Sequence, residues 1–178
     1  MIIILSQKLD TDSVYTGDEL FKIYHYPARY RNQIHTGDTF VYYQGNRYDK
    51  SQRYYFGTGK IGEIRQEDDE NYYAELLNVV RFEKKVPIYL PDGGYVEQLG
   101  YETIRKSINP PWQSSIRPLS KTAYEYIFQK SGEKEAIEKY NASLKKAIQN
   151  YYISKDKNAV LQILKLAQQL ADIYGLKE

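Results

Sequence analysis

The chain has 178 residues, of which 42% are hydrophobic and 27% charged, and its formal net charge is +2. This composition is that of a globular protein with one domain of ordinary size plus an appendage, and it excludes a disordered chain. The absence of cysteine excludes a disulfide framework and a thiolate metal site, and no apolar run is long enough to span a membrane, so we expect a cytoplasmic protein with no membrane partner.

The first half of the chain is predicted to consist mainly of strands. The apolar residues 1–5 are predicted to form a buried first strand. They are too few for a signal peptide and lack its basic leader. Pro27 suits the first position of a short helix over residues 27–34, where a missing N–H is not needed. Further extended segments are predicted at residues 20–26, 39–44, 54–65 and 72–82.

The second half becomes helical. A turn is predicted at residues 91–94, a short helix at 102–108 and an extended segment at 112–117. Ser120 is a suitable N-cap for a helix over residues 121–130, and the following Ser-Gly pair is a suitable stop.

The C-terminal residues differ in character from the tyrosine-rich strands. Residues 133–152 and 156–174 are helical in pattern, and the last helix repeats apolar residues at helical spacing. We therefore predict a first domain over residues 1–132 and a C-terminal helical hairpin over residues 133–178. Three roles are open for the hairpin: packing on the first domain, oligomerisation, or linkage to an effector domain.

Familiar catalytic patterns do not fit. Gly57 to Gly62 matches the dinucleotide-binding fingerprint, but that motif needs a helix directly after it, whereas an acidic turn and another strand follow here. We interpret these glycines as part of a curved strand. Asp69 with residues 83–85 has a loose nuclease-like spacing that is common by chance in so charged a chain. His25 and His35 have no cysteine partners. We expect no catalytic residue, no metal and no cofactor, and predict that the chain is not an enzyme.

Tyrosine and local positive charge point instead to nucleic acid. The chain has 20 tyrosines, and residues 22–65 carry eight basic and three acidic side chains, a local excess of five positive charges. Tyrosine stacks on bases, and basic side chains bind phosphates by releasing counterions. There are two alternatives: an AT-rich genome also produces many tyrosines, and a basic surface can exist without a partner. The positions of these residues in the sequence therefore have to distinguish nucleic-acid binding from the alternatives.

Three segments combine the required groups. Residues 24–34 alternate aromatic, basic and amide side chains, residues 40–45 form a strand that ends in glycine, and residues 112–117 contain the single tryptophan. Alternation requires either Tyr42 or Tyr43 to face the core, and Trp112 could instead close one end of a barrel.

The order of the segments resembles the EVE domains of the PUA-like group, to which the YTH and ASCH domains also belong. Four motifs carry the resemblance over residues 1–132: a short helix with an aromatic-x-x-Arg-aromatic/Asn motif, a Gly-Asp-x-hydrophobic-aromatic strand, a Gly-x-x-x-Ile/Val-Gly strand and a Ser-hydrophobic-Arg/Gln-Pro-hydrophobic-Ser segment. They lie at residues 26–32, 37–43, 57–62 and 115–120. The version here looks most like the EVE-like domains of modification-dependent restriction endonucleases, where they precede an HNH nuclease or an AAA+ motor.

The resemblance implies an α+β fold, a small partly open PUA-like β-barrel with flanking helices, that binds a flipped modified base in an aromatic pocket. We expect Tyr26, Tyr30, Tyr43 and Trp112 in the pocket, Gln44 and Ser115 at the base edge, and Arg29, Arg31, Arg47 and Arg117 at phosphates. The expected partners are double-stranded DNA with a modified base and an HNH nuclease or AAA+ motor domain in the same protein or complex. The chain would then be the specificity module of a restriction system in phage defence. The alternatives are an RNA ligand and a protein-interaction or oligomerisation module.

Overall fold

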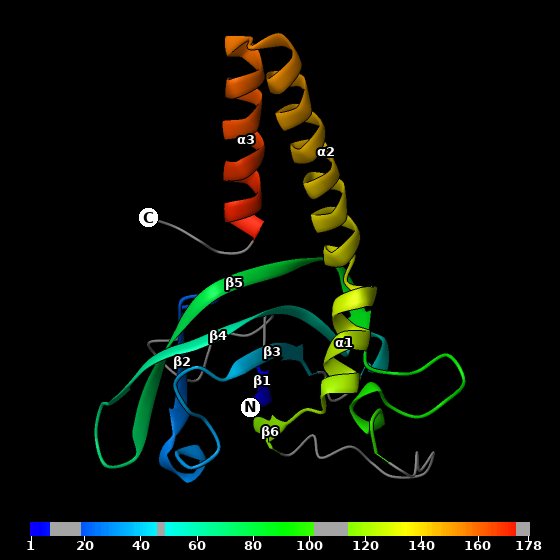
Figure 1. The fold of residues 1–178 in the computed structure, drawn as a ribbon. Coiled ribbons are helices and arrows are strands. Elements are labelled where there is room, and N and C mark those ends of the chain that lie inside the picture. The colour runs from blue at the N-terminus through cyan, green and yellow to red at the C-terminus, as the bar shows by residue number, and fades with distance from the viewer. Residues whose placement is uncertain (8–18, 46–48, 102–113, 174–178) are drawn as a thin grey trace.

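The structure is a computed structural model that describes residues 1–7, 19–45, 49–101 and 114–173. It has an α+β fold in which a six-stranded sheet curls into a half-barrel and is followed by helices (Figure 1). The strands are β1 (Ile2–Ser6), β2 (Ile23–Pro27), β3 (Thr39–Gln44), β4 (Tyr54–Gln66), β5 (Asn71–Pro87) and β6 (Ile116–Pro118). The α-helices in the described residues are α1 (Lys121–Lys130), α2 (Glu133–Ser154) and α3 (Lys157–Ile173), and single 3-10 turns are η1 (Ala28–Tyr30), η2 (Lys50–Gln52) and η3 (Val96–Gln98).

The strand order is β2-β5-β4-β3-β1-β6, so β2 and β6 form the two edges of the sheet. Strand β1 pairs with β3 in parallel, and the other neighbouring pairs are antiparallel. Three register shifts along the β4–β5 ladder mark irregularities of the kind that bend a sheet. These two long strands therefore supply the curl that brings the sheet edges toward each other.

Both faces of the central strands are buried. Alternation along β3 sends Phe40 and Tyr42 to one face and Val41 and Tyr43 to the other. The first face belongs to a cluster that draws on all six strands, which we call the inner cluster. The second face packs against α1 and the chain around η3, and we call it the outer cluster.

Two glycines of β4 make room for aromatic rings. A Cβ atom at Gly59 would lie 2.7 Å from the Phe40 ring and 2.9 Å from the Leu77 carbonyl oxygen, and one at Gly57 would lie 2.6 Å from Phe21. The glycine run lies inside β4, which leads through the acidic turn into β5. This confirms the interpretation of the run as part of a curved strand.

Most of the predicted elements match, but the extended segment expected over residues 20–26 begins only at Ile23, after a turn at residues 20–22, and two further elements differ. The helix expected over residues 27–34 is only the turn η1, because the chain turns away after Tyr30 to bury Ile34 in the inner cluster before β3. The strand expected to end at residue 82 continues to Pro87. The helix expected at residues 102–108 lies outside the described residues.

The helices begin and end as the capping residues predict. The Ser120 side chain accepts a hydrogen bond from the Ala123 N–H at the start of α1, and Gly132, with φ +85°, separates α1 from α2. Helices α2 and α3 lie antiparallel and rise from the end of α1, away from the sheet (Figure 1). Within the described residues, no helix has the length and apolar character needed to cross a membrane.

Candidate nucleic-acid interface

Two tyrosines from one edge of the half-barrel bond the backbone on the opposite side of the sheet, one at β1 and one just before the edge strand β6. The Tyr24 hydroxyl, on β2, donates a hydrogen bond to the Ser6 carbonyl oxygen (3.2 Å) at the end of β1. The Tyr30 hydroxyl, on η1, accepts one from the Ser115 N–H (3.0 Å) just before β6. Side chains thus close the gap between the sheet edges here, and we call this line of contact the tyrosine seam.

Tyr26 lies in the same row of strand β2 as Tyr24. Its ring stacks on Tyr24 (centroids 6.3 Å apart) and on Tyr72 of β5 (5.7 Å), and the side chain is only 1% exposed. Its hydroxyl has no hydrogen-bond partner among the described residues, and burial raises its pKa to about 12. A buried hydroxyl without a partner is unfavourable, so this phenol is a candidate for contact with a ligand.

Arg29 and Arg31 project from η1 into solvent next to the seam. The Arg29 guanidinium lies 4.9 Å from the centre of the Tyr30 ring, and Arg31 Nη1 donates to the Ala28 carbonyl oxygen (3.3 Å). The segment from Tyr24 to Arg31 therefore turns its tyrosines inward and its arginines outward. This is the division of roles that base stacking with phosphate contacts requires.

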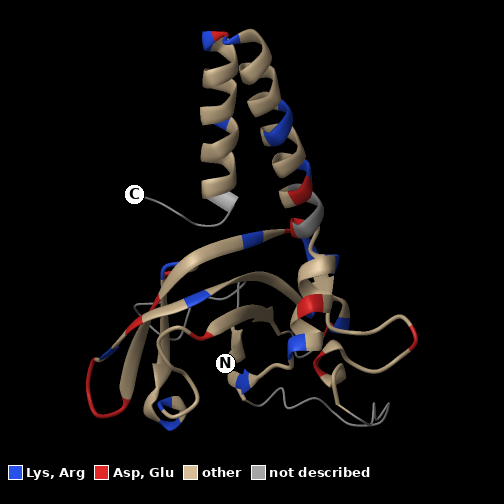
Figure 2. Ribbon diagram, in the orientation of Figure 1, with Lys and Arg blue, Asp and Glu red and all other residues tan. Residues whose placement is uncertain are grey.

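An acidic turn borders the two arginines. The Ala28 N–H donates to the Glu70 carbonyl oxygen (2.6 Å), which brings η1 against residues 67–70 at the tip of the β4–β5 hairpin. Figure 2 shows this tip in red beside the loop that carries the arginines in blue. A polyanion is therefore favoured on the side of η1 that faces away from the hairpin tip.

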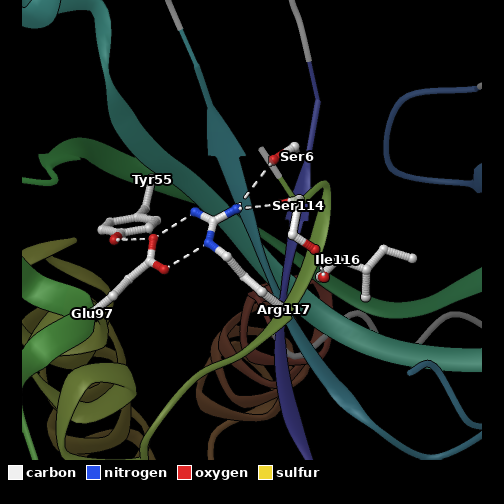
Figure 3. Close-up of polar contacts among 6 residues, drawn as sticks. All are labelled: Ser6, Tyr55, Glu97, Ser114, Ile116 and Arg117. Atoms are coloured by element: carbon white, nitrogen blue, oxygen red, sulfur yellow. Dashed lines mark hydrogen bonds and ion pairs between the residues drawn. The ribbon is translucent and has the colours of Figure 1, made fainter. Parts of the chain in front are cut away.

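Arg117 has a different environment from the one expected. Its guanidinium is 3% exposed and forms two bonds with Glu97, from Nε to Oε2 (2.7 Å) and from Nη2 to Oε1 (2.5 Å). Nη1 donates to the Ser114 carbonyl oxygen (3.0 Å) and to Ser6 Oγ (3.3 Å), and Tyr55 donates to the same carboxylate (Figure 3). Burial disfavours the charge, but the bonds to Glu97 outweigh it and raise the pKa of Arg117. Arg117 therefore holds a buried carboxylate rather than facing solvent at a phosphate.

Tyr43 does not share a pocket with Tyr26 and Tyr30. It belongs to the outer cluster, where Arg117 lies 4.8 Å from its ring centre, and burial raises its pKa to about 12. Tyr26 and Tyr30 belong to the inner cluster, on the other side of the sheet. The single pocket expected for all three is wrong, because alternation along β3 gives the inner face to Tyr42.

The remaining expected residues are partly accounted for. Gln44 is 2% exposed at the end of β3 and donates to the Gly45 carbonyl oxygen (3.2 Å), and Ser115 lies half-buried in the tyrosine seam. Arg47 and Trp112 lie outside the described residues. The sequence reasoning missed Tyr24, although period-two alternation with Tyr26 signals it, and Tyr72 and Glu97, which only the strand pairing and the packing of η3 bring into place.

A pocket of about 340 Å³ lies elsewhere, on the outside of β2, β4 and β5. Its lining includes Ile23, Tyr73 and Glu75 together with the ion pair between Arg65 and Glu63 (2.6 Å). Two carboxylates make it a poor place for phosphate. In the ranges that the structure describes, no group of three or more potential ligands is arranged to hold a metal ion.

The fold defines the class of protein, an α+β protein whose six-stranded sheet forms a half-barrel closed along one line by tyrosine side chains. No protein-family model matches the chain, and no curated protein matches its sequence significantly. The function has to be argued from the seam itself.

Proposed function

We propose that the chain is a PUA-like domain of the EVE type that binds double-stranded DNA carrying a modified base. In this proposal it is the specificity module of a modification-dependent restriction system, and an HNH nuclease or AAA+ motor domain supplies the cleavage. The chain itself has no catalytic role and needs no cofactor. The observation that carries the proposal is the arrangement of residues 24–31, with tyrosines in the half-barrel and Arg29 and Arg31 in solvent beside them.

The energetics of base capture fit these groups. Flipping a base out of the duplex costs a few kcal/mol, least where the base is already poorly paired. Stacking on aromatic side chains returns about 1–3 kcal/mol per base, and phosphate contacts from Arg29 and Arg31 add to it. A polar group on the base edge would also give the Tyr26 hydroxyl a partner, which no described residue provides.

The tyrosine seam is the proposed entry. Tyr24 donates to Ser6, and Tyr30 hydrogen-bonds with Ser115 and Ser114, so side-chain hydrogen bonds worth about 1 kcal/mol net each close the seam here in place of a strand ladder. A swing of the Tyr30 side chain would release the Ser115 N–H and expose the Tyr24–Tyr26 stack. The base edge could then accept the bond that Ser115 now gives to Tyr30.

The test is fluorescence-anisotropy binding to short duplexes that carry one modified base, against the unmodified duplex at fixed near-physiological salt. Methyl-adenine, methyl-cytosine and hydroxymethyl-cytosine are the three modifications to compare. We expect a preference for one of them, and we expect Tyr26→Phe to reduce that preference. Because the hydroxyl has no hydrogen-bond partner within the described part of the chain, this variant should fold normally, so a lost preference reports on the ligand.

A second pair of variants separates phosphate contacts from base recognition. Arg29→Ala with Arg31→Ala should weaken binding to every duplex and make the slope of log affinity against log salt shallower by about 2. Lys165→Ala, an exposed cation on α3, is the control and should change neither. Equal, steeply salt-dependent binding to all duplexes would show that the chain has only a basic surface and no base recognition. Stronger binding to an RNA of matched sequence would show that the ligand is RNA and not DNA.

A further inference from the structure

The C-terminal hairpin has little interior of its own. Helices α2 and α3 contact each other, but among their described side chains the only buried apolar ones are Ala147, Ala159 and Leu170. The hairpin extends away from the sheet (Figure 1). Two helices form a single layer. If one outer face of this layer carries apolar residues, another layer is needed to cover that face.

Helix α3 carries two apolar rows at the spacing of a helical bundle. The row that faces α2 consists of Ala159, Ile163, Leu166 and Leu170. A second row, displaced by one residue, consists of Val160, Leu164, Ala167 and Ala171. Val160 is 38% exposed and Leu164 is 60% exposed, so the second row is not used inside the hairpin.

Helix α2 extends the same exposed surface. Ile148 (37% exposed) follows the buried Ala147 by one residue, and Tyr152 (68% exposed) lies one turn further along. A step of one residue rotates by about 100° around a helix. Because the two helices are antiparallel, this step leads to the same side of the hairpin in both. Ile148, Tyr152, Val160 and Leu164 therefore form one surface, which we call the hairpin face.

We propose that the hairpin face binds the hairpin face of a second copy of this chain, so that two hairpins form a four-helix bundle. The four large side chains expose on the order of 400 Å² of apolar surface, which is the size of the largest apolar patch on a typical monomer, a patch that is often functional. Since about 60% of an interface is apolar, a patch of this size corresponds to a total buried area of about 1,300 Å², enough for a stable dimer.

The features of the face suit a two-fold partner. The hairpin face has bulky side chains, Tyr152 and Leu164, and small ones, Ala167 and Ala171 on α3. In a two-fold dimer the bulky side chains of one copy can pack over the small side chains of the other. The exposed rim on α2 carries both signs of charge, with Glu138 and Lys145 two helical turns apart on one side. Antiparallel pairing of two such rims brings opposite charges together. This inference does not depend on binding of a base.

The test is the molar mass of the full chain by sedimentation equilibrium over about a hundredfold range of concentration. We expect twice the chain mass of 20.9 kDa, with dissociation on dilution. Leu164→Glu should give the single-chain mass with unchanged helix content by circular dichroism, and Tyr152→Glu should do the same if Leu164→Glu perturbs the hairpin.

The matched control is Ile153→Glu. Ile153 is next to Tyr152 and is 84% exposed, but helical spacing points it away from the hairpin face, so this variant should remain a dimer. A wild-type chain that stays monomeric at every concentration overturns the proposal, even if the face then binds a different protein. A dimer that survives both Leu164→Glu and Tyr152→Glu also overturns it.

Discussion

The Tyr30 hydroxyl and the Ser115 N–H are joined by a 3.0 Å hydrogen bond across 85 positions of sequence, from the end of β2 to the start of β6. Since β2 and β6 are the two edges of the sheet, this bond and that of Tyr24 with Ser6 close the half-barrel through side chains. A closure of this kind can open without breaking a strand ladder, which is why the proposed entry lies there.

Replacement of Tyr30 by phenylalanine should destabilise the protein. The variant keeps the ring but leaves the half-buried Ser115 N–H without its partner, at an expected cost of about 1–2 kcal/mol in the free energy of unfolding. Tyr26→Phe is the matched control, because its hydroxyl makes no hydrogen bond with the described residues, and it should be neutral or stabilising. Urea denaturation of both variants measures the difference, and equal effects would contradict it.

Replacement of Arg117 should act on stability and not on phosphate binding. Arg117→Met leaves the Glu97 carboxylate buried and unpaired, at an expected cost of about 3–5 kcal/mol, while the double variant with Glu97→Met should recover much of it. The stabilities of the wild type and of the single and double variants, measured by thermal unfolding, form a double-mutant cycle. If the folded double variant lost DNA affinity with a shallower salt slope, Arg117 would be a phosphate contact after all.

A methyl group at Gly59 should be costly, whereas one at Gly62 should be tolerated better. In Gly59→Ala the Cβ atom meets the buried Phe40 ring at 2.7 Å and the Leu77 backbone oxygen at 2.9 Å, and neither can move freely. In Gly62→Ala the nearest atoms, at 2.9 and 3.0 Å, belong to exposed side chains that can swing away. We expect Gly59→Ala to lose about 1–3 kcal/mol in denaturant unfolding and Gly62→Ala clearly less. The reverse order would contradict the packing of the β4 bend.

Stability should fall in alkali because burial raises the pKa of Tyr26, Tyr43 and Tyr55. Burial raises the pKa of Tyr26 and of Tyr43 to about 12, above the value of about 10 in an unfolded chain. Between these values the folded state holds protons that the unfolded state has lost, so the stabilisation is complete below about pH 10 and is lost as the pH rises toward 12.

Unfolding free energies measured from neutral pH upward would show this decline. Tyr26→Phe should reduce the slope of the unfolding free energy against pH by the amount that corresponds to about one proton, and Tyr43→Phe should do the same. Absorbance titration of the folded protein should show Tyr26 and Tyr43 ionising only as the pH approaches about 12. Ionisation of all tyrosines together near pH 10 in the folded protein would contradict this prediction.

Local patterns in the sequence were sufficient for much of the secondary structure. The alternation of residues 39–44 and the Ser120 cap of residues 121–130 each depend on neighbours a few positions away, and β3 and α1 have those limits. The resemblance to EVE domains led to the expectation of a partly open barrel, and the curled sheet agrees with it at the level of an α+β half-barrel. The same patterns singled out residues 24–34 as a segment of alternating aromatic, basic and amide groups.

The sequence by itself thus determined which residues are strands, caps and turns, because period and capping are short-range properties. Only the tertiary structure decided which of those residues meet. Tyr26 stacks on Tyr72 because β2 pairs with β5, and Tyr43 is separated from Tyr26 because alternation along β3 puts it on the other face of the sheet. Arg117 is bound to Glu97 because η3 packs over the outer face next to β6. These two contacts join residues 46 and 20 positions apart, and the free energy that selects them comes from burial of the whole sheet and not from any local pattern.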